Sequence, residues 1–405
     1  MTLPTAAPLP NHVPVELVRD VDFSSDPDVL ADPYAAFDRL RDEGDILWSP
    51  KLGGHWIVLA ASLVREALQH PEVFSNYPAG IPPLNEFWPR KLIPQELDGD
   101  EHTRYRRLLS PFFSPSAIRP MAEAVRERAR DLIAAVADRD EVEFIAAVGI
   151  PLPSSVFLDL FGLPLEQANV FTDWTQRLLH SGDPQVAAEA GQNIVSQLLG
   201  LIAERQSEPR DDLISSLTTS AVVDGRPLTT EELLDTAFLL FLAGLDTVTS
   251  QLGVLFHHLA QHADLQRQLR RTPALIPAAL EELLRLYPIV PPVRTLTRDY
   301  CLGGVDMKAG DKVLVASSAA SRDPKAYTNP RQMELARGGA WTTAFGMGPH
   351  RCLGAHLARQ ELTIVLELML SMMPEFTLAP GFTPKWYTAG NVWGISELRL
   401  RFARS

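Results

Sequence analysis

The sequence predicts a mainly α-helical protein that carries small β-sheets. Apolar residues recur at helical spacing along most of the chain, and the longest such run extends from Thr229 to about His262. A second long helical pattern follows a glycine-rich loop at residues 345–354. Short β-like runs, such as residues 55–59 and 312–315, lie between glycine and proline turns. These observations indicate helices packed around one buried central helix.

Composition limits the class of protein. The chain has 405 residues, of which 46% are hydrophobic and 21% charged, which fits one large globular domain. A net charge of −13 argues against nucleic acid as a partner. Two cysteines do not make a disulfide framework, and no apolar run reaches the roughly 18 residues of a membrane span. We therefore expect a monomeric, cytoplasmic protein that does not enter membranes.

The domain organisation is expected to be simple. Residues 1–13 are rich in proline and small residues and lack the basic start and apolar core of a signal peptide. Residues 1–26 are expected to form a flexible N-terminal segment. Residues 27–405 are expected to form a single domain, because the sequence contains no internal repeat and no low-complexity block.

In the first half of the chain, helical patterns surround one hairpin and one proline-rich loop. The loop at residues 75–97 holds five prolines, which exclude a long helix. Ser114 and Pro115 mark a helix start. The expected elements are a helix at 34–41, a hairpin formed by 46–48 and 55–59, and helices at 62–69, 101–109, 118–137 and 153–161.

In the second half, a pair of helices precedes the central helix. The pair, at 167–179 and 185–205, is joined by a turn at residues 181–184 whose composition predicts a hinge. Thr229 and Glu232 have the spacing of a capping box at the start of the central helix. The other expected elements are helices at 211–217 and 277–287, a hairpin turn at 224–225, β-like pieces at 295–297, 300–302, 312–315, 376–378 and 397–402, and a helix that ends near residue 373.

The central helix contains a local conflict. Gly244 costs about 1 kcal/mol in a helix interior, and Asp246 is unfavourable in an apolar helix unless it is paired or hydrated. Such conflicts are expected at functional sites. A packing glycine beside a polar pair on a wet helix edge is the alternative.

Two charged pairs have helical spacing. His102 and Arg106 are four residues apart, so two cationic side chains share one face and repel each other unless an anion lies between them. A solvated surface is the simpler interpretation. Glu282 and Arg285 are three residues apart and can form an ion pair, although most such pairs lie on the surface and contribute little.

The loop at residues 345–354 carries the strongest signal. Cys352 lies between glycines, two residues after His350, and precedes a helix N-terminus whose free N–H groups and dipole favour a thiolate. A thiolate there is a metal ligand or a nucleophile, and a small buried apolar cysteine is the alternative. Zinc needs several Cys or His ligands at short spacing, whereas one thiolate suits haem.

Several motifs together resemble one family. The pattern Phe345-x-x-Gly348-x-His350-x-Cys352-x-Gly354 resembles the signature of the cytochrome P-450 monooxygenases. Ala243-Gly244-x-Asp246-Thr247 resembles the central-helix motif of that family, and Glu282-x-x-Arg285 its structural salt bridge, which Arg337 is expected to complete. The resemblance covers about residues 30–404. Residues 53–57, 244–248 and 296–300 resemble the camphor-hydroxylating branch of the bacterial members.

The resemblance implies a fold and a cofactor. The fold is a triangular helical prism around haem, with a long central helix and minor antiparallel sheets. The cofactor is haem b, with Cys352 as the iron ligand, Phe345 shielding the thiolate, and His102, Arg106, Arg294 and His350 binding the haem carboxylates. The expected cofactor-binding residues are His102, Arg106, Ala243, Gly244, Arg294, Phe345, Gly348, His350, Cys352 and Gly354.

The resemblance also implies a reaction, the hydroxylation of a C–H bond of a small apolar substrate, such as a terpenoid or an aromatic compound, with one oxygen atom of dioxygen. Gly244 would let oxygen approach, Asp246 would relay protons, and a local opening of the helix would aim the Thr247 hydroxyl at dioxygen. Arg90 and Lys91 raise the possibility of a substrate carboxylate. The expected pocket residues are Phe87, Trp88, Leu239, Leu240, Val290, Val293, Asn391 and Val392.

Electrons would come from a separate ferredoxin that docks near Arg104, Arg107 and Arg351, and the helix pair at 167–206 would form a lid over the pocket. The sequence departs from the family pattern where Met333 replaces an aromatic residue and where residues 336–339 are rich in glycine.

Three other classes compete. A haem sensor could use the same thiolate, but it needs no proton relay such as Asp246 and Thr247. A peroxide-driven peroxygenase of the same fold would typically lack this acid–alcohol pair. A cysteine hydrolase needs a base, and the sequence places none clearly beside Cys352.

Overall fold

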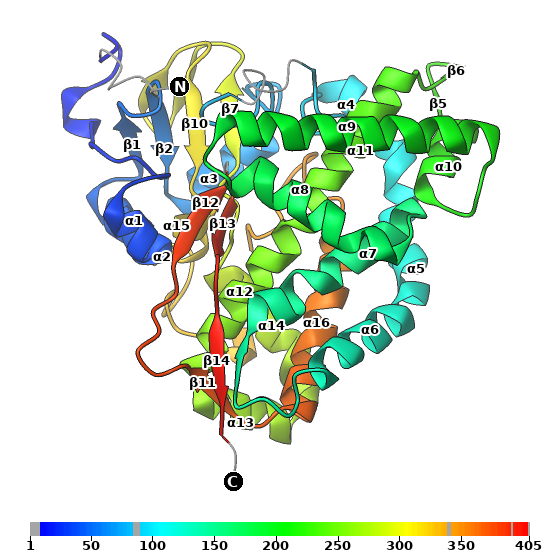
Figure 1. Cartoon of the computed structure of the whole chain (residues 1–405). Coiled ribbons are helices and arrows are strands. Elements are labelled where there is room, and N and C mark those ends of the chain that lie inside the picture. Colours follow the sequence, from blue (N-terminus) through cyan, green and yellow to red (C-terminus); the bar gives the residue numbers. More distant parts are fainter. Residues whose placement is uncertain (1–8, 84–89, 338–341, 390–391, 404–405) are drawn as a thin grey trace.

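Helices make up most of the protein in the computed structural model, which describes residues 9–83, 90–337, 342–389 and 392–403 (Figure 1). The helices are α1 (Pro27–Ala31), α2 (Pro33–Glu43), α3 (Ala61–Gln69), α4 (Gly99–Leu109), α5 (Pro115–Ile118), α6 (Ala122–Ala134), α7 (Pro151–Phe161), α8 (Ala168–His180), α9 (Pro184–Ser207), α10 (Leu213–Thr219), α11 (Thr230–Leu245), α12 (Thr247–Ala260), α13 (Ala263–Arg271), α14 (Ile276–Leu286), α15 (Ser317–Ser321) and α16 (Ala355–Met372).

The strands are short and form small sheets. The largest sheet has five strands in the order β1-β2-β10-β7-β3, and β11, β14 and β4 form a second sheet. The strands are β1 (Ile46–Ser49), β2 (His55–Val58), β3 (Phe74–Ser75), β4 (Glu141–Glu143), β5 (Val222–Val223), β6 (Arg226–Pro227), β7 (Val293–Leu296), β8 (Tyr300–Leu302), β9 (Val305–Met307), β10 (Lys312–Val315), β11 (Phe376–Leu378), β12 (Trp386–Ala389), β13 (Val392–Ile395) and β14 (Arg399–Phe402).

The sheets are mostly antiparallel, as expected, but the pairing of β10 with β2 departs from this. Strand β10 runs parallel to β2, with Val313 opposite Trp56. A parallel pair needs a long connection, and more than 250 residues separate these two strands along the chain. The sequence therefore gives no local signal for the direction of this pair.

The expected flexible N-terminal segment is packed wherever the structure describes it. Phe23 is fully buried, and Val13 is 4% exposed. Arg19 donates its backbone N–H to the carbonyl of Trp48 at 2.8 Å. Residues 9–26 therefore belong to the folded domain, because their few apolar side chains cover the edge of the five-stranded sheet.

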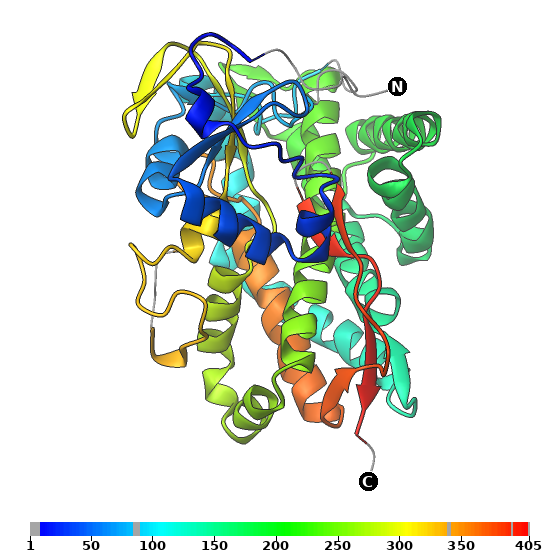
Figure 2. The same cartoon turned by 90° about the vertical axis from the view of Figure 1, so that its left-hand side faces the viewer.

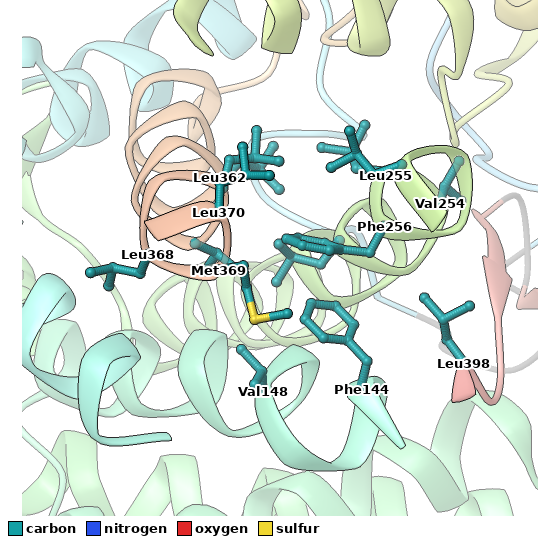
Figure 3. Packing of buried hydrophobic residues seen from close by; sticks show 14 of the residues in the cluster. Phe144, Val148, Val254, Leu255, Phe256, Leu362, Leu368, Met369, Leu370 and Leu398 are labelled. Atoms are coloured by element: carbon teal, nitrogen blue, oxygen red, sulfur yellow. The ribbon is translucent and has the colours of Figure 1, made fainter. Parts of the chain in front are cut away.

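The central helix is divided at Asp246 into α11 and α12. The capping box at Thr229 and Glu232 is confirmed. The two parts enter different hydrophobic cores: α11 packs with α7, α9 and α10, whereas α12 packs with α6, α14 and α16. Figure 3 shows the second core, where Phe256 of α12 lies near Phe144 and Met369. Asp246 therefore stands at the junction between two cores.

The central helix, formed by α11 and α12, is also long and strongly apolar. Thr230–Ala260 is long and apolar enough to cross a membrane, but 72% of its most apolar window is buried inside the protein. Its apolar surface is thus used for internal packing.

The helix pair α8–α9 lies on the side of the molecule seen in green in Figures 1 and 2. Asp183 caps α9 by accepting a hydrogen bond from the backbone N–H of Gln185 at 2.8 Å. Gly182 in the connection has a φ of 68°, which favours glycine. Helix α9 packs along α11, so the pair covers the part of the central helix that precedes Asp246.

Candidate active site

The loop before α16 is shaped by its own backbone. Cys352 donates its N–H to the carbonyl of Phe345 at 2.8 Å, which closes the loop. Gly346 and Gly348 have φ values of 64° and 68°. A Cβ atom on Gly348 would lie 2.5 Å from the carbonyl oxygen of Leu68, so no side chain fits there. Gly354 is the N-cap residue of α16. These constraints fix the position of the cysteine.

The thiol of Cys352 faces a cavity and is exposed to it. Burial raises the pKa of this thiol, and the N–H of Gly354 and the charge of Arg106 only partly offset that effect. The N–H of Gly354 favours the thiolate, as expected of the loop, but burial of the sulfur opposes it. A cation in the cavity would supply the missing stabilisation of the thiolate.

The cavity has a volume of about 1460 Å³. Ordinary ligand pockets measure roughly 300–1,000 Å³, so this cavity has room for a prosthetic group and a substrate together. Cys352 lines it, as do Ala243, Gly244 and Thr247 of the central helix. Phe345, Gly354 and the four expected basic residues also line it, whereas Gly348 packs against the backbone of Leu68 at the end of α3.

The four basic residues come together at one edge of the cavity. The rings of His102 and His350 lie 4.2 Å apart. Arg106 donates to the carbonyl of Arg351 at 2.6 Å, and Arg294 donates to its neighbour Val293 at 2.8 Å.

Burial makes the charges of these groups costly. It lowers the pKa of His102 to about 4 and that of Arg294 to about 10. Among these four residues, His350 has a carboxylate partner, since its Nε2 lies 3.0 Å from Oδ1 of Asp98. A ligand with carboxylates fits this arrangement. Its carboxylates would be the anion that two cationic side chains on one helix face, His102 and Arg106, require.

Asp98 is a functional residue that sequence reasoning missed. Its Oδ1 lies 3.0 Å from Nε2 of His350, and Ser75 donates its hydroxyl to the same carboxylate. Hydrogen bonds from both residues hold the pKa of Asp98 below its usual value, although burial opposes them. The carboxylate thereby orients His350. No local pattern could have revealed a contact between residues 252 positions apart.

The central-helix motif is open at Asp246, but Thr247 does not behave as expected. The hydroxyl of Thr247 donates to the carbonyl of Ala243 at 2.8 Å. The expected opening of the helix is present, because α11 ends at Leu245 and α12 begins at Thr247. The expected release of the Thr247 hydroxyl towards the cavity is wrong, because its side-chain hydrogen bond to the carbonyl of Ala243 persists across the break. Since the hydroxyl proton is engaged, the oxygen remains free to accept a hydrogen bond.

Gly244 has a packing role as well as a place in the cavity wall. A Cβ atom there would lie 3.1 Å from Cδ2 of Phe157 on α7. The glycine thus admits a phenyl ring at the side of the helix, which adds a reason for its presence in a helix interior beyond the approach of oxygen.

Asp246 is 2% exposed and lines the cavity. Its Oδ1 lies 2.9 Å from Nε2 of His180, the last residue of α8. Its Oδ2 has no hydrogen-bond partner among the described residues. Sequence reasoning missed His180, because its position at a helix end carries no chemical signature.

The expected pocket residues divide into two groups. Leu239, Leu240, Val290, Val293 and Val392 line the cavity, while Phe87, Trp88 and Asn391 lie outside the described residues. Other elements add wall residues that the sequence did not indicate. These are Ala79 and Ile81, Val156 and Phe157 of α7, Leu178 and Leu179 of α8, Gln192, Val195, Ser196 and Leu199 of α9, and Glu361 of α16.

Arg90 and Lys91 are engaged elsewhere. Arg90 makes a bidentate ion pair with Asp235, at 2.6 and 3.0 Å. The ammonium group of Lys91 lies 4.9 Å from the centre of the Tyr77 ring. Both cations are thus held by the protein itself.

The structural triad has the expected geometry. Arg285 binds both carboxylate oxygens of Glu282 at 2.8 Å, and Arg337 donates Nε to Oε1 at 2.8 Å. Burial opposes ionisation of Glu282, but hydrogen bonds from both arginines hold its pKa below the usual value. Met333 stands where the family pattern has an aromatic residue, but Arg337 still reaches Glu282.

Comparisons with known proteins identify the family of this chain. The family described as Cytochrome P450 matches residues 158–272 and 274–381. "Probable cytochrome P450 127A1" of Sinorhizobium fredii is 35% identical over 98% of this chain and 97% of its own length. The crystal structure of cytochrome P450 CYP101C1 has a TM-score of 0.91 at 34% identity, and that of CYP101J2 has 0.90 at 29%; both comparisons cover 98% of this chain and 100% of the other.

The chain therefore belongs to the cytochrome P-450 family and has its fold. It is a haem-dependent monooxygenase, an oxidoreductase that uses dioxygen, a substrate and a redox partner. Among the described residues, no cluster of three or more His, Cys, Asp or Glu could hold a metal ion.

Proposed function

We propose that this protein hydroxylates a C–H bond of a small, neutral, largely apolar molecule, such as a terpenoid or an aromatic compound. The observation that carries the proposal is the cavity beside Cys352, whose walls on α7, α8 and α11 are mostly aliphatic or aromatic. The capture of Arg90 by Asp235 argues against a role for this arginine in binding a substrate carboxylate.

The proposed cofactor is haem b. Cys352 would bind its iron, and His102, Arg106, Arg294 and His350 would hold its two carboxylates, with Asp98 orienting His350. When bound, haem held by a thiolate would supply the chemistry that activates dioxygen. Phe345, which lies under the guanidinium of Arg359 at 4.4 Å, would keep water from the sulfur.

The proposed work of the central helix is proton transfer. Asp246 would accept a proton and release it into the cavity from Oδ2. The oxygen of Thr247 would accept a hydrogen bond from an O–H group in the cavity, since its own proton is held by Ala243. The pair would thereby direct protons to the oxygen that is reduced to water.

The proposed electron donor is a separate ferredoxin. Arg104, Arg107 and Arg351 are exposed although the chain as a whole has a charge of −13. Arg107 lies in an open surface pocket with Pro349, next to the cysteine loop, whereas Arg104 pairs with Asp224 at 3.3 Å. We place the protein in the cytoplasm as a monomer, with residues 9–403 as one domain.

The test is spectroscopic. The haem-loaded protein, reduced and exposed to carbon monoxide, should show the strongly red-shifted Soret band of a thiolate-ligated haem. Neutral terpenoids should then change the spin state of the ferric protein, and the same skeletons bearing a carboxylate should not. An unshifted band would remove the thiolate, and a preference for the carboxylates would overturn the proposed substrate class.

A further inference from the structure

The end of helix α8, which belongs to the expected lid, contacts the carboxylate of Asp246. Nε2 of His180 lies 2.9 Å from Oδ1 of Asp246, although the two residues are 66 positions apart. Leu178, Leu179 and Ser181 line the cavity on either side. His180 is also the last helical residue before the hinge at Gly182. Any opening of the pair α8–α9 at this hinge would therefore separate the imidazole from the carboxylate.

Among the described residues, the carboxylate of Asp246 has one hydrogen-bond partner, the imidazole of His180. Its side chain is 2% exposed, whereas the side chain of His180 is 16% exposed. Oδ2 of Asp246 is buried and has no partner among the described residues. The carboxylate of Asp246 thus lies between the partly exposed imidazole of His180 and the cavity.

The imidazole is held in place by a third element. The ring of Tyr387 on β12 stands edge-on to the ring of His180, with the ring centres 4.5 Å apart. The tyrosine hydroxyl is fixed by Ser250 of α12 at 2.8 Å. A Cβ atom on Gly394 would lie 2.4 Å from that hydroxyl, so this position of the tyrosine requires the glycine. This support indicates a defined orientation rather than a chance contact.

We propose that His180 is the residue that passes protons from solvent to Asp246, and that it does so only while the α8–α9 pair is closed. The imidazolium gives its Nε2 proton to Oδ1 of Asp246 and regains a proton from water, and no other bond changes. Closure over a substrate would thereby connect proton delivery to substrate binding. This inference rests on the proposed function of Asp246.

The other charged and titratable groups near His180 either stay protonated or are engaged by other partners. Burial, followed by the charge of Asp246, raises the pKa of Tyr387, which stays protonated. Arg177, one turn earlier on α8, is engaged by Glu189 at 2.8 Å and by Asp173 at 3.7 Å. Asp183 caps α9.

The test compares His180→Gln with Arg177→Gln. The glutamine amide can still donate a hydrogen bond to Asp246 but cannot transfer a proton. We expect His180→Gln to keep substrate affinity within about twofold and to form product about tenfold or more slowly, with a larger solvent deuterium isotope effect. Arg177→Gln perturbs the same lid without touching Asp246, and it should leave the isotope effect unchanged.

A second measurement does not depend on turnover. The ¹⁵N resonances of the His180 ring should report a hydrogen-bonded Nε2 in the wild-type protein and shift in Asp246→Asn. In the Asp246→Asn background, His180→Gln should cause no further loss of product.

Two outcomes would overturn the inference. One is wild-type turnover and isotope effect in His180→Gln, which would leave His180 a structural contact only. The other is an additive loss in the double variant, because independent effects would separate His180 from Asp246. Failure of the proposed function would look different: the wild-type protein itself would lack the shifted carbon monoxide band or form no hydroxylated product.

Discussion

The cysteine loop and the Asp246 junction lie on one cavity but are built in opposite ways. The loop is held by backbone constraints within a few residues, such as the bond from Cys352 to Phe345 and the left-handed Gly348. Asp246 is held by side chains from separate elements, with His180 in direct contact and Tyr387 behind it. One region is thus specified locally and the other by the tertiary fold.

The difference has a chemical meaning. A metal ligand must keep one position, so a rigid loop suits it. A proton relay must exchange protons with solvent and respond to substrate, so a contact across a movable lid suits it. Substitutions in the loop should therefore remove the cofactor or the activity outright, whereas those at the junction should change how protons and electrons are used.

The largest effect is expected at the sulfur. Cys352→His should abolish product formation, because the imidazole lacks the negative charge that the thiolate supplies to the haem. The measurement is product formation with the reduced carbon monoxide spectrum of the same sample. Retained turnover in a sample that still binds haem would contradict the assignment of Cys352.

The second effect tests the rigidity of the loop. Gly348→Ala combines a left-handed backbone with a Cβ atom 2.5 Å from the carbonyl oxygen of Leu68, and should lower the free energy of unfolding by about 2–4 kcal/mol. Gly346→Ala is the matched control. It has a similar φ of 64°, but the nearest atom to its Cβ would be 4.0 Å away, so about 1 kcal/mol is expected. Denaturant unfolding measures both, and equal losses would show that the contact with Leu68 is immaterial.

This comparison also explains how much the sequence could predict. The Cys352 loop, the capping box at Thr229 and the Glu282–Arg285 pair are encoded by short spacings, and each was recognised from them. Hairpin β12–β13 and helix α15 were missed, because short elements with weak periodicity form only through tertiary contacts. Asp98 and His180 were missed for the same reason: ordinary residues become functional through partners far away in the chain.

The error at Thr247 is instructive in another way. The sequence correctly marked a disturbed helix at 243–247, but it could not say which hydrogen bond is lost. The break falls after Leu245, where the helix passes from one hydrophobic core to the other. The position of that junction depends on how both cores pack, which no local pattern contains.

The third effect concerns the junction. Thr247→Ala removes the hydroxyl oxygen that would accept a hydrogen bond in the cavity, so reducing equivalents should be released as hydrogen peroxide. We expect the ratio of product formed to electrons consumed from the reduced ferredoxin to fall on the order of tenfold. Thr247→Ser keeps the hydroxyl and should retain most of the coupling. Unchanged coupling in Thr247→Ala would remove Thr247 from the relay.

The smallest effect is expected for the pH dependence of stability at His102, one of the four basic residues at the edge of the cavity. Burial lowers the pKa of His102 to about 4 from 6.5, so the unfolded state binds more protons between these values, and the haem-free protein should lose stability as the pH falls from 6.5 to 4. The contribution is at most about 1.4 kcal/mol per pH unit. Because His55 and His258 shift in the same direction, the quantity to measure is the difference in unfolding free energy between wild type and His102→Asn.

Haem should reduce that pH-dependent difference. Carboxylates beside the imidazole would raise the pKa of His102 towards its unfolded value, since they stabilise the charged form. The difference between wild type and variant should therefore depend on pH in the haem-free protein and much less in the haem-loaded protein. An equal pH dependence in both forms would mean that His102 does not meet the haem carboxylates, and that its pairing with His350 and Asp98 serves the protein alone.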